Sequence, residues 1–321
     1  MENEQQQIKQ ALNRVKEVID PYDEQIKEKW NSSFPQYPIT YSPILCVTGF
    51  LFAYIVIVPI LKKFFRNIKN SFCLKKNYEE DMIYLHKYGN VDQYLPSLSP
   101  FCLKLEAYLR FASLKYTVVS KPDFSLAPKG KLPFIERNGE ILDDSSFIIN
   151  WINDQIEFDP DSNLVSDEKA IALATKRLLE DHLYFIIMKQ RWLTKDGYSF
   201  TKTCFKDIPW YCRPCVLRKI KKNVQNTLHL QGLGRFSDDE LYELANEDIK
   251  CLSSLVGESE YVFGTQEPTS LDIYIFSFIA SIIQLPYDYP LKTLVMNRRN
   301  LVNHCKRIGH LYFQEYDWDF E

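Results

Sequence analysis

The residues with the greatest potential for chemistry lie in the stretch Leu98-Ser-Pro-Phe-Cys102. Ser99 can act as a helix N-cap, because its hydroxyl can accept hydrogen bonds from the free N–H groups of the first turn. Pro100 suits the first helical position, where a backbone N–H would have no partner. The N-terminus of a helix that follows a strand can hold an anion or activate a thiol. These residues predict a site at Ser99, with plain helix capping as the alternative.

Two further stretches could complete such a site. Leu132-Pro133 comes just before a predicted strand, where a cis peptide bond would be a structural feature. Asp144-Ser145 precedes an apolar helical run and can cap that helix, which alone would explain the pair. Cys102 is interpreted as a buried core cysteine. Ser99 occupies the position that the attacking thiol would have in a C-x-x-C redox site.

The elements that position these residues form a folded unit over 81–158. Runs of β-branched and aromatic residues predict strands at 82–87, 116–119, 133–136 and 140–142, and amphipathic runs predict helices at 100–113 and 145–157. Asn138-Gly139 is a strong hairpin signal between the last two strands. A strand, a loop and a helix opened by Ser-Pro are the entry of a thioredoxin-like βαβ unit.

Residues 165–321 are predicted to be helical throughout. Periodic apolar runs occur at 168–193, 215–230, 237–257, 270–285 and 297–313. Thr269 and Asp272 form a predicted capping box before a helix that is apolar on most faces, which we expect to be the central buried helix. The predicted fold class is α+β, with a thioredoxin-like N-terminal domain followed by an all-α domain.

A charge-free run at 41–61 predicts one transmembrane helix ahead of both domains. About 20 residues span roughly the 30 Å of the bilayer core. A polar arm precedes this run at 1–40, and a basic linker follows it at 62–80. Because positive charge stays on the cytosolic side, residues 62–321 are predicted to face the cytosol, on an endomembrane or the mitochondrial outer membrane.

The composition limits the classes of function. The chain has 321 residues, of which 45% are hydrophobic and 14% aromatic, as in an ordered globular protein. Its net charge of −3 gives no indication of nucleic-acid binding.

Eight irregularly spaced cysteines form no disulfide framework, and Cys212 and Cys215 lack the further ligands that structural zinc needs. We predict no metal site and ordinary packing for this pair. The basic run 213–222 is either a solvated helix face or a membrane-facing patch.

Several spaced motifs resemble one branch of the glutathione S-transferase superfamily. The likeness is closest to the failed-axon-connections and cadmium-responsive family, which is related to the metaxins, and it extends from about residue 80 to residue 320. The motifs are Leu98-Ser-Pro-Phe-Cys-Leu-Lys-Leu-Glu106, Gly130-Lys-Leu-Pro-Phe-Ile-Glu136, Asp144-Ser-Ser-Phe-Ile-Ile149 and Pro268-Thr-Ser-Leu-Asp272.

The resemblance implies roles for individual residues, with glutathione as the cofactor. Transferases of this superfamily use a hydroxyl or thiol at the end of the first strand to stabilise the glutathione thiolate, and Ser99 has that position. Leu132, before the cis-proline Pro133, would pair its backbone with the tripeptide. Asp144 and Ser145 would hold its γ-glutamyl end. A hydroxyl at a helix N-terminus can donate to a thiolate and stabilise it.

Two departures from the transferase pattern count against catalysis. Only residues 120–132 link the second and third strands, where a transferase usually has a helix, and the long loop 88–98 is expected to lie over the pocket. The sequence therefore predicts a membrane-anchored, non-catalytic or weakly catalytic adaptor for an unidentified protein. The alternative is a glutathione-dependent transferase that acts in detoxification or metal stress. A homodimer is compatible with both.

Overall fold

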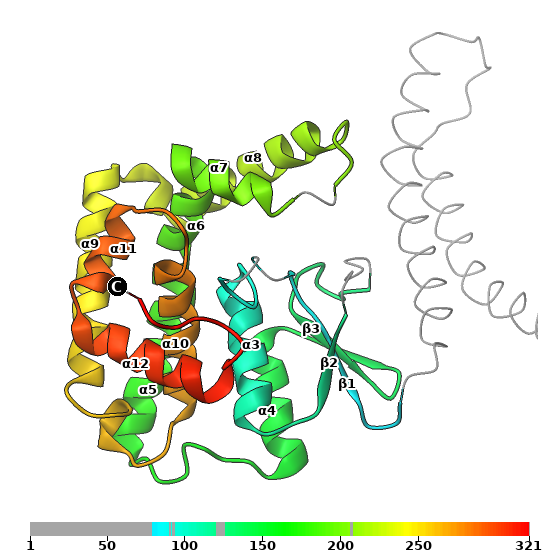
Figure 1. Cartoon of the computed structure of the whole chain (residues 1–321), viewed down its shortest axis with the longest axis vertical. Coiled ribbons are helices and arrows are strands. Elements are labelled where there is room, and N and C mark those ends of the chain that lie inside the picture. Colours follow the sequence, from blue (N-terminus) through cyan, green and yellow to red (C-terminus); the bar gives the residue numbers. More distant parts are fainter. Residues whose placement is uncertain (1–78, 90, 92–93, 120–125, 206–207, 321) are drawn as a thin grey trace, which may run out of the picture. The chain divides into compact units, whose positions relative to one another are not determined.

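The computed structural model describes residues 79–320, apart from 90, 92–93, 120–125 and 206–207 (Figure 1). Within this range, a four-stranded sheet and two helices are followed by a larger helical half. The predicted polar arm at 1–40 and nearly all of the predicted basic linker at 62–80 lie outside the described residues.

The sheet has the strand order β2-β1-β3-β4. β1 pairs in parallel with β2, whereas β3 is antiparallel to both β1 and β4. Asn138 and Gly139 have φ angles of 50° and 84°, which suit the two-residue hairpin turn that their sequence predicts. This topology confirms the predicted βαβ unit followed by a hairpin. The strands are β1 (Ile83–His86), β2 (Tyr116–Val119), β3 (Phe134–Arg137) and β4 (Glu140–Asp143).

Two helices pack between the sheet and the helical half (Figure 1). α3 (Pro100–Phe111) connects β1 to β2, and α4 (Ser145–Ile156) follows β4. Because α3 shares one apolar core with the sheet and packs against α10 and α12, nine of its twelve residues are buried. α3 therefore supports both halves of the molecule.

The helical half contains the predicted helices and some that the periodicity did not predict. The run 168–193 is divided by a π-helix, η1, between α5 and α6. α7 and α11 have 9 and 7 residues, which is too short for periodicity to identify with confidence. The elements are α5 (Ser166–Leu178), η1 (Leu179–Leu183), α6 (Tyr184–Leu193), α7 (Lys195–Thr203), α8 (Arg213–Gln231), η2 (Leu233–Arg235), α9 (Asp238–Val256), η3 (Val262–Gly264), α10 (Ser270–Ile283), α11 (Pro290–Met296) and α12 (Arg299–Tyr312).

α10 is the central helix of this half, and all 14 of its residues are buried. Asp272 fixes its first turn, because its carboxylate accepts from the backbone N–H of Thr269 at 2.7 Å and of Val262 at 2.9 Å. The same carboxylate lies 2.8 Å from Nε2 of the buried His304. The structure confirms both the predicted central helix and its capping residues.

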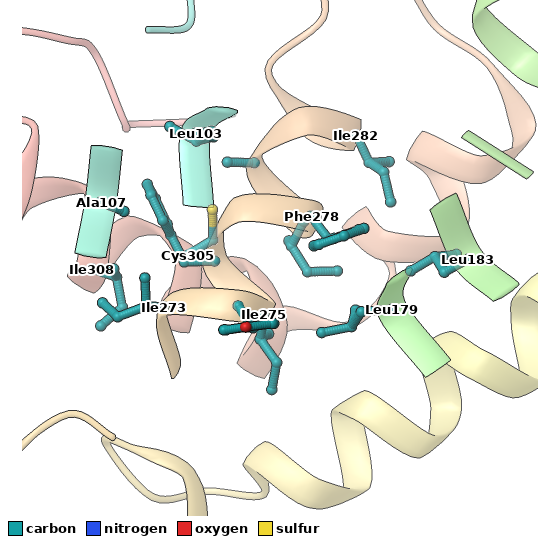
Figure 2. Close-up of a cluster of buried hydrophobic side chains, with 14 of the residues drawn as sticks. Leu103, Ala107, Leu179, Leu183, Ile273, Ile275, Phe278, Ile282, Cys305 and Ile308 are labelled. Atoms are coloured by element: carbon teal, nitrogen blue, oxygen red, sulfur yellow. The ribbon is translucent and has the colours of Figure 1, made fainter. Parts of the chain in front are cut away.

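One apolar core joins the two halves. In Figure 2, Leu103 and Ala107 of α3 lie beside residues of α10 and α12, among them Ile273, Phe278 and Cys305. All five side chains are completely buried. Burying one large apolar side chain contributes about 1.5–3 kcal/mol to folding, so a shared core of this kind makes the two halves one folding unit.

The predicted fold class needs one correction, which concerns the transmembrane helix at 41–61. In the part of the chain that the structure describes, no helix combines the length and the apolar character that a bilayer crossing requires. The most apolar helix, α10, has 14 residues. It is therefore about 21 Å long against roughly 30 Å of bilayer core, and it is buried in protein. Residues 41–61 themselves lie outside the described residues. The fold class that the described residues support is the thioredoxin-like unit with its helical second half.

Candidate functional site

Ser99 is the N-cap residue of α3, as its sequence predicts. Its Oγ accepts from the backbone N–H of Cys102 at 3.4 Å, and its own N–H donates to Ser97 Oγ at 3.3 Å. Pro100 occupies the first helical position. Because a hydroxyl has one proton to donate as well as lone pairs to accept with, capping leaves the Ser99 O–H able to donate to an anion.

The peptide bond between Leu132 and Pro133 is cis, at the position where the sequence indicates one. Leu132 is buried and packs in a small cluster with Cys102, Leu126 and Phe134. The first turn of α3 therefore lies against the cis-proline segment.

Asp144 is the N-cap of α4, and its backbone is unusual for a residue with a side chain. Its φ is 72° and its ψ is 120°. Such a conformation costs on the order of 1–3 kcal/mol and is found mainly where surrounding structure enforces it. The Asp144 carboxylate accepts from the backbone N–H groups of Ser146 at 3.0 Å and Phe147 at 3.4 Å, which offsets part of this cost. Ser145 is buried beside it.

The strand register brings these segments to one end of the sheet. His86, the last residue of β1, pairs with Phe134, and Phe134 pairs with Asp143. Positions 133 and 144, one step beyond these partners, therefore adjoin each other. The turn at Ser99, the cis bond and the Asp144-Ser145 pair lie together, and their use in binding glutathione stays a prediction.

A buried ion pair adjoins this end of the sheet. Lys104 of α3 is completely buried, and its Nζ donates to Glu180 Oε1 at 2.5 Å and to Ser146 Oγ at 3.2 Å. The same amine lies 4.3 Å from the centre of the Tyr274 ring. Burial lowers the pKa of Lys104, and the Glu180 carboxylate opposes that shift. This contact ties α3, α4, η1 and α10 together next to Asp144.

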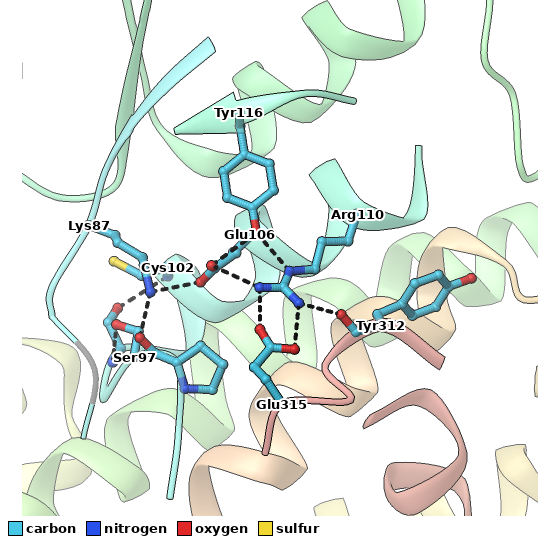
Figure 3. A network of polar contacts seen from close by, with 10 residues as sticks. Lys87, Ser97, Cys102, Glu106, Arg110, Tyr116, Tyr312 and Glu315 are labelled. Carbon is cyan, nitrogen blue, oxygen red and sulfur yellow. Dashed lines mark hydrogen bonds and ion pairs between the residues drawn. The ribbon is translucent and has the colours of Figure 1, made fainter. Parts of the chain in front are cut away.

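A second polar network fixes the segment that leads to Ser99 (Figure 3). The buried Lys87 donates to the carbonyl of Pro96 at 2.6 Å and pairs with Glu106 at 2.8 Å. Arg110 continues the network to the C-terminal segment, because its guanidinium donates to both carboxylate oxygens of Glu315, at 2.5 and 3.0 Å. Burial opposes ionisation of Glu315, but hydrogen bonds from Arg110 and the backbone, together with the charges of Arg110 and Lys87, outweigh it and lower the pKa of that carboxyl.

Cys102 has the environment of a core cysteine. Its side chain is fully buried, and burial raises the pKa of its thiol to about 11. Since the thiolate is the reactive form, Cys102 is a poor nucleophile at neutral pH.

The link between β2 and β3 is short. Residues 126–132, its described part, form turns and bends without a helix. Lys129 pairs with Asp143 at 3.1 Å and lies over the Phe147 ring at 5.0 Å.

Sequence reasoning missed Lys87 and Lys104. Lys104 stands between Leu103 and Leu105 in an amphipathic helix, and its burial depends on the packing of that helix on two sides, which the local pattern does not indicate. Lys87 gave no signal either, since its partners depend on the course of the loop after β1.

Comparison with known proteins gives matches over both halves. The profile of the glutathione S-transferase N-terminal domain matches residues 100–197, and that of the glutathione S-transferase C-terminal domain matches residues 245–308. Failed axon connections of Drosophila melanogaster is 33% identical over 259 residues, which cover 76% of this chain and 61% of that protein. Metaxin-3 of Xenopus laevis is 31% identical over 246 residues, which cover 72% of this chain and 73% of metaxin-3.

Two further relatives have names that state a role. An Arabidopsis thaliana relative, 25% identical over 218 residues, which cover 67% of this chain and 68% of the relative, is named a mitochondrial outer membrane import complex protein, metaxin. The isoprene-epoxide–glutathione S-transferase of Rhodococcus is 27% identical over 239 residues, which cover 70% of this chain and 98% of the enzyme. Among solved structures, a β-etherase from Sphingobium has a TM-score of 0.51 at 16% identity, covering 73% of this chain and 98% of the β-etherase, and it shares the fold.

Proposed function

Because this chain belongs to the metaxin-like branch of the glutathione S-transferase superfamily, we propose that it is an adaptor that binds another protein and has little or no transferase activity. The observation that carries this proposal is the short link between β2 and β3. Its described part, 126–132, has no helix, and its Lys129 is paired with Asp143. A transferase uses this region for one end of glutathione, so a site built from the remaining residues would hold only the other end.

The charged side chains beside the candidate site are already paired within the protein, which supports a protein-binding role over catalysis with glutathione. Lys104 is paired with Glu180, and Lys87 with Glu106. Both pairs serve to hold elements of the fold together. Glutathione carries two carboxylates and one ammonium group, and a tight site must supply partners for them.

Calorimetry of the purified full-length chain with glutathione tests this proposal. We expect no saturable heat at millimolar glutathione, while an active transferase measured in parallel gives a normal isotherm. A saturable heat that disappears in Ser145→Ala but persists in Ser254→Ala would overturn the adaptor proposal. Ser254 is a suitable control because it is an exposed serine on α9.

A glutathione-dependent transferase is the second candidate. It is favoured by the grouping of Ser99, the cis Leu132–Pro133 bond and the Asp144-Ser145 pair at one end of the sheet, and by the similarity to the Rhodococcus enzyme. This candidate requires retention on glutathione resin and conjugation of a small electrophile. Ser99→Ala would then reduce the conjugation rate far more than it reduces glutathione binding, because the hydroxyl acts on the thiolate.

We propose a protein partner at the mitochondrial outer membrane, on the strength of the name of the Arabidopsis relative. Cross-linking of the tagged chain in intact cells, followed by fractionation and mass spectrometry, tests this. Enrichment of outer-membrane import proteins is the expected result, and a distribution that excludes mitochondria would contradict it.

A further inference from the structure

Two cysteines stand at the exposed start of α8, away from the candidate glutathione site. Cys212 is the N-cap residue of α8, and Cys215 is its third helical residue. Both side chains are exposed, and both thiols are free. The sequence predicted ordinary packing for this pair, and their exposure corrects that prediction.

The helix places the two thiols within reach of each other. Side chains three residues apart in a helix lie on the same face, with Cβ atoms about 5–6 Å apart. A disulfide needs Cβ atoms about 3.5–4.5 Å apart, so joining this pair requires the first turn of α8 to bring the two residues roughly 1–2 Å closer. At the start of this turn the N–H of Arg213 donates to the carbonyl of Pro209 at 3.0 Å, and Pro214 has no N–H to donate.

The segment around the two cysteines is basic. The attacking species in disulfide exchange is the thiolate. From residue 208 to residue 231 the sequence has five basic residues and no acidic residue. One of them, Arg213, lies between the two cysteines, and its guanidinium donates to the carbonyl of Ile208 at 3.0 Å, which holds it beside the start of the helix.

The N-terminus of α3 provides a comparison within the same chain. There the equivalent positions are Ser99 and the buried Cys102, so an attacking thiol is absent and the second thiol is inaccessible. At α8 both positions are cysteines and both are exposed. In the described residues no group of three or more histidine, cysteine or acidic side chains is arranged to hold a metal, so the pair lacks the further ligands of a structural zinc site.

We propose that Cys212 and Cys215 form a redox-active dithiol that exchanges with low-molecular-weight disulfides of the glutathione disulfide class. The Cys212 thiolate attacks one sulfur of glutathione disulfide, breaks the S–S bond and releases one glutathione thiolate. The Cys215 thiolate then attacks the Cys212 sulfur and releases the second. The protein dithiol is oxidised by two electrons, glutathione disulfide is reduced to two glutathione molecules, and the two thiol protons pass to solvent or to the released thiolates. This inference goes beyond the adaptor proposal and does not depend on it.

Mass spectrometry of the full-length chain tests the proposal. The chain is equilibrated in buffers of increasing glutathione disulfide to glutathione ratio, quenched with acid, alkylated and digested with trypsin. Because trypsin cleaves poorly before proline, the peptide 207–218 keeps both cysteines. We expect this peptide to lose two hydrogens as the ratio rises, with a reversible midpoint. Failure to form this disulfide in excess glutathione disulfide, or bonding of either residue to Cys204 instead, would overturn the proposal.

Two single substitutions test the order of attack. Cys215→Ser should trap a mixed glutathione disulfide at Cys212, on the order of tenfold more abundant than at Cys251, because the resolving thiol is gone. Cys251 is the matched control, since it is an exposed thiol on α9 with no cysteine three residues away. Equal modification of Cys212 and Cys251 would mean that exposure alone governs reactivity, which contradicts a built redox pair.

Discussion

Lys104 of α3 and Glu180 of η1 form an ion pair that spans the two halves of the molecule, with Nζ 2.5 Å from Oε1. The side chain of Lys104 is completely buried and that of Glu180 is 8% exposed. Glu180 stands in a π-helical turn, a form that is rare and often found at functional sites. Ser146, the second residue of α4, completes the ion pair and connects it to the Asp144-Ser145 pair.

Removal of one partner of this pair should destabilise the fold strongly. Glu180→Gln leaves the buried Lys104 ammonium without a counter-charge, which costs about 3–5 kcal/mol in measured cases. The double variant Lys104→Met with Glu180→Met should regain most of that loss, because no buried charge then remains. Urea unfolding of the three proteins measures these differences.

Arg177→Met provides a control for the same carboxylate. Arg177 also contacts Glu180, at 3.1 Å, but its side chain is 58% exposed. We expect a cost of about 0–1 kcal/mol for its removal, since exposed ion pairs contribute little. A large loss in this variant, or a small one in Glu180→Gln, would contradict the assigned role of Lys104.

Residues of the candidate site that depend on local chemistry could be predicted from the sequence. A cap before a helix, a proline before a strand and an acid–serine pair each leave a signal within a few positions. Ser99 and Asp144 take the N-cap positions and Pro133 the cis bond that those signals indicate, but the positive φ of Asp144 left no signal. The ion pair could not be predicted, because Lys104 and Glu180 are 76 positions apart. Only the packing of α3 against η1 brings them together.

The burial of Cys102 should make the stability of the protein depend on pH in the alkaline range. Burial raises the pKa of its thiol from about 9 to about 11. The unfolded chain therefore loses this proton first as the pH rises. The contribution of Cys102 to stability is fully present below pH 9 and is lost as the pH rises through 11. A shift of this size corresponds to about 2–3 kcal/mol.

Cys102→Ala removes this contribution. Urea midpoints measured at pH 8 and at pH 10 should fall less steeply with pH in the variant than in the natural chain. Cys251→Ala, which replaces an exposed thiol, should leave the slope unchanged. A slope that is the same in all three proteins would show that Cys102 ionises as freely in the folded protein as in the unfolded chain.

The buried carboxylate of Asp272 should be one of the most sensitive positions in the helical half. It accepts from two backbone N–H groups, those of Thr269 and Val262, and contacts His304. Asp272→Ala leaves these donors buried without partners, at about 1–3 kcal/mol for each. We expect a poorly folded protein, detected by circular dichroism and proteolysis, whereas Thr265→Ala in the preceding turn should fold normally. A well-folded Asp272→Ala protein would contradict this.

The helical pattern was predictable where it was long and periodic, and not where tertiary packing decided the conformation. α10 was predicted as the central helix because its apolar residues occupy nearly every face. The π-helical turn at Leu179–Leu183 could not be predicted, since the apolar period continues through it. The packing of the C-terminal segment could not be predicted either, because it depends on the fit of the Trp318 ring against Gly309 of α12.

The C-terminal segment packs against α12 where Trp318 meets Gly309. Trp318 is fully buried, and its Nε1 donates to the carbonyl of Phe313 at 2.8 Å. A Cβ atom on Gly309 would overlap Cδ2, Cγ and Cε2 of the Trp318 ring. Glycine to alanine inside a helix normally stabilises by about 1 kcal/mol. Here the forced displacement of a buried ring should reverse the sign and cost about 1–3 kcal/mol.

Thermal unfolding of Gly309→Ala measures this effect against a matched control. Gly89→Ala adds the same methyl group where no atom lies within 4 Å, so it should change the melting temperature very little. Adding Trp318→Leu to Gly309→Ala should make the glycine substitution nearly neutral, because the smaller side chain leaves room for the methyl group. If Gly309→Ala costs the same with and without Trp318, the two residues are not coupled and the C-terminal segment is not held by this contact.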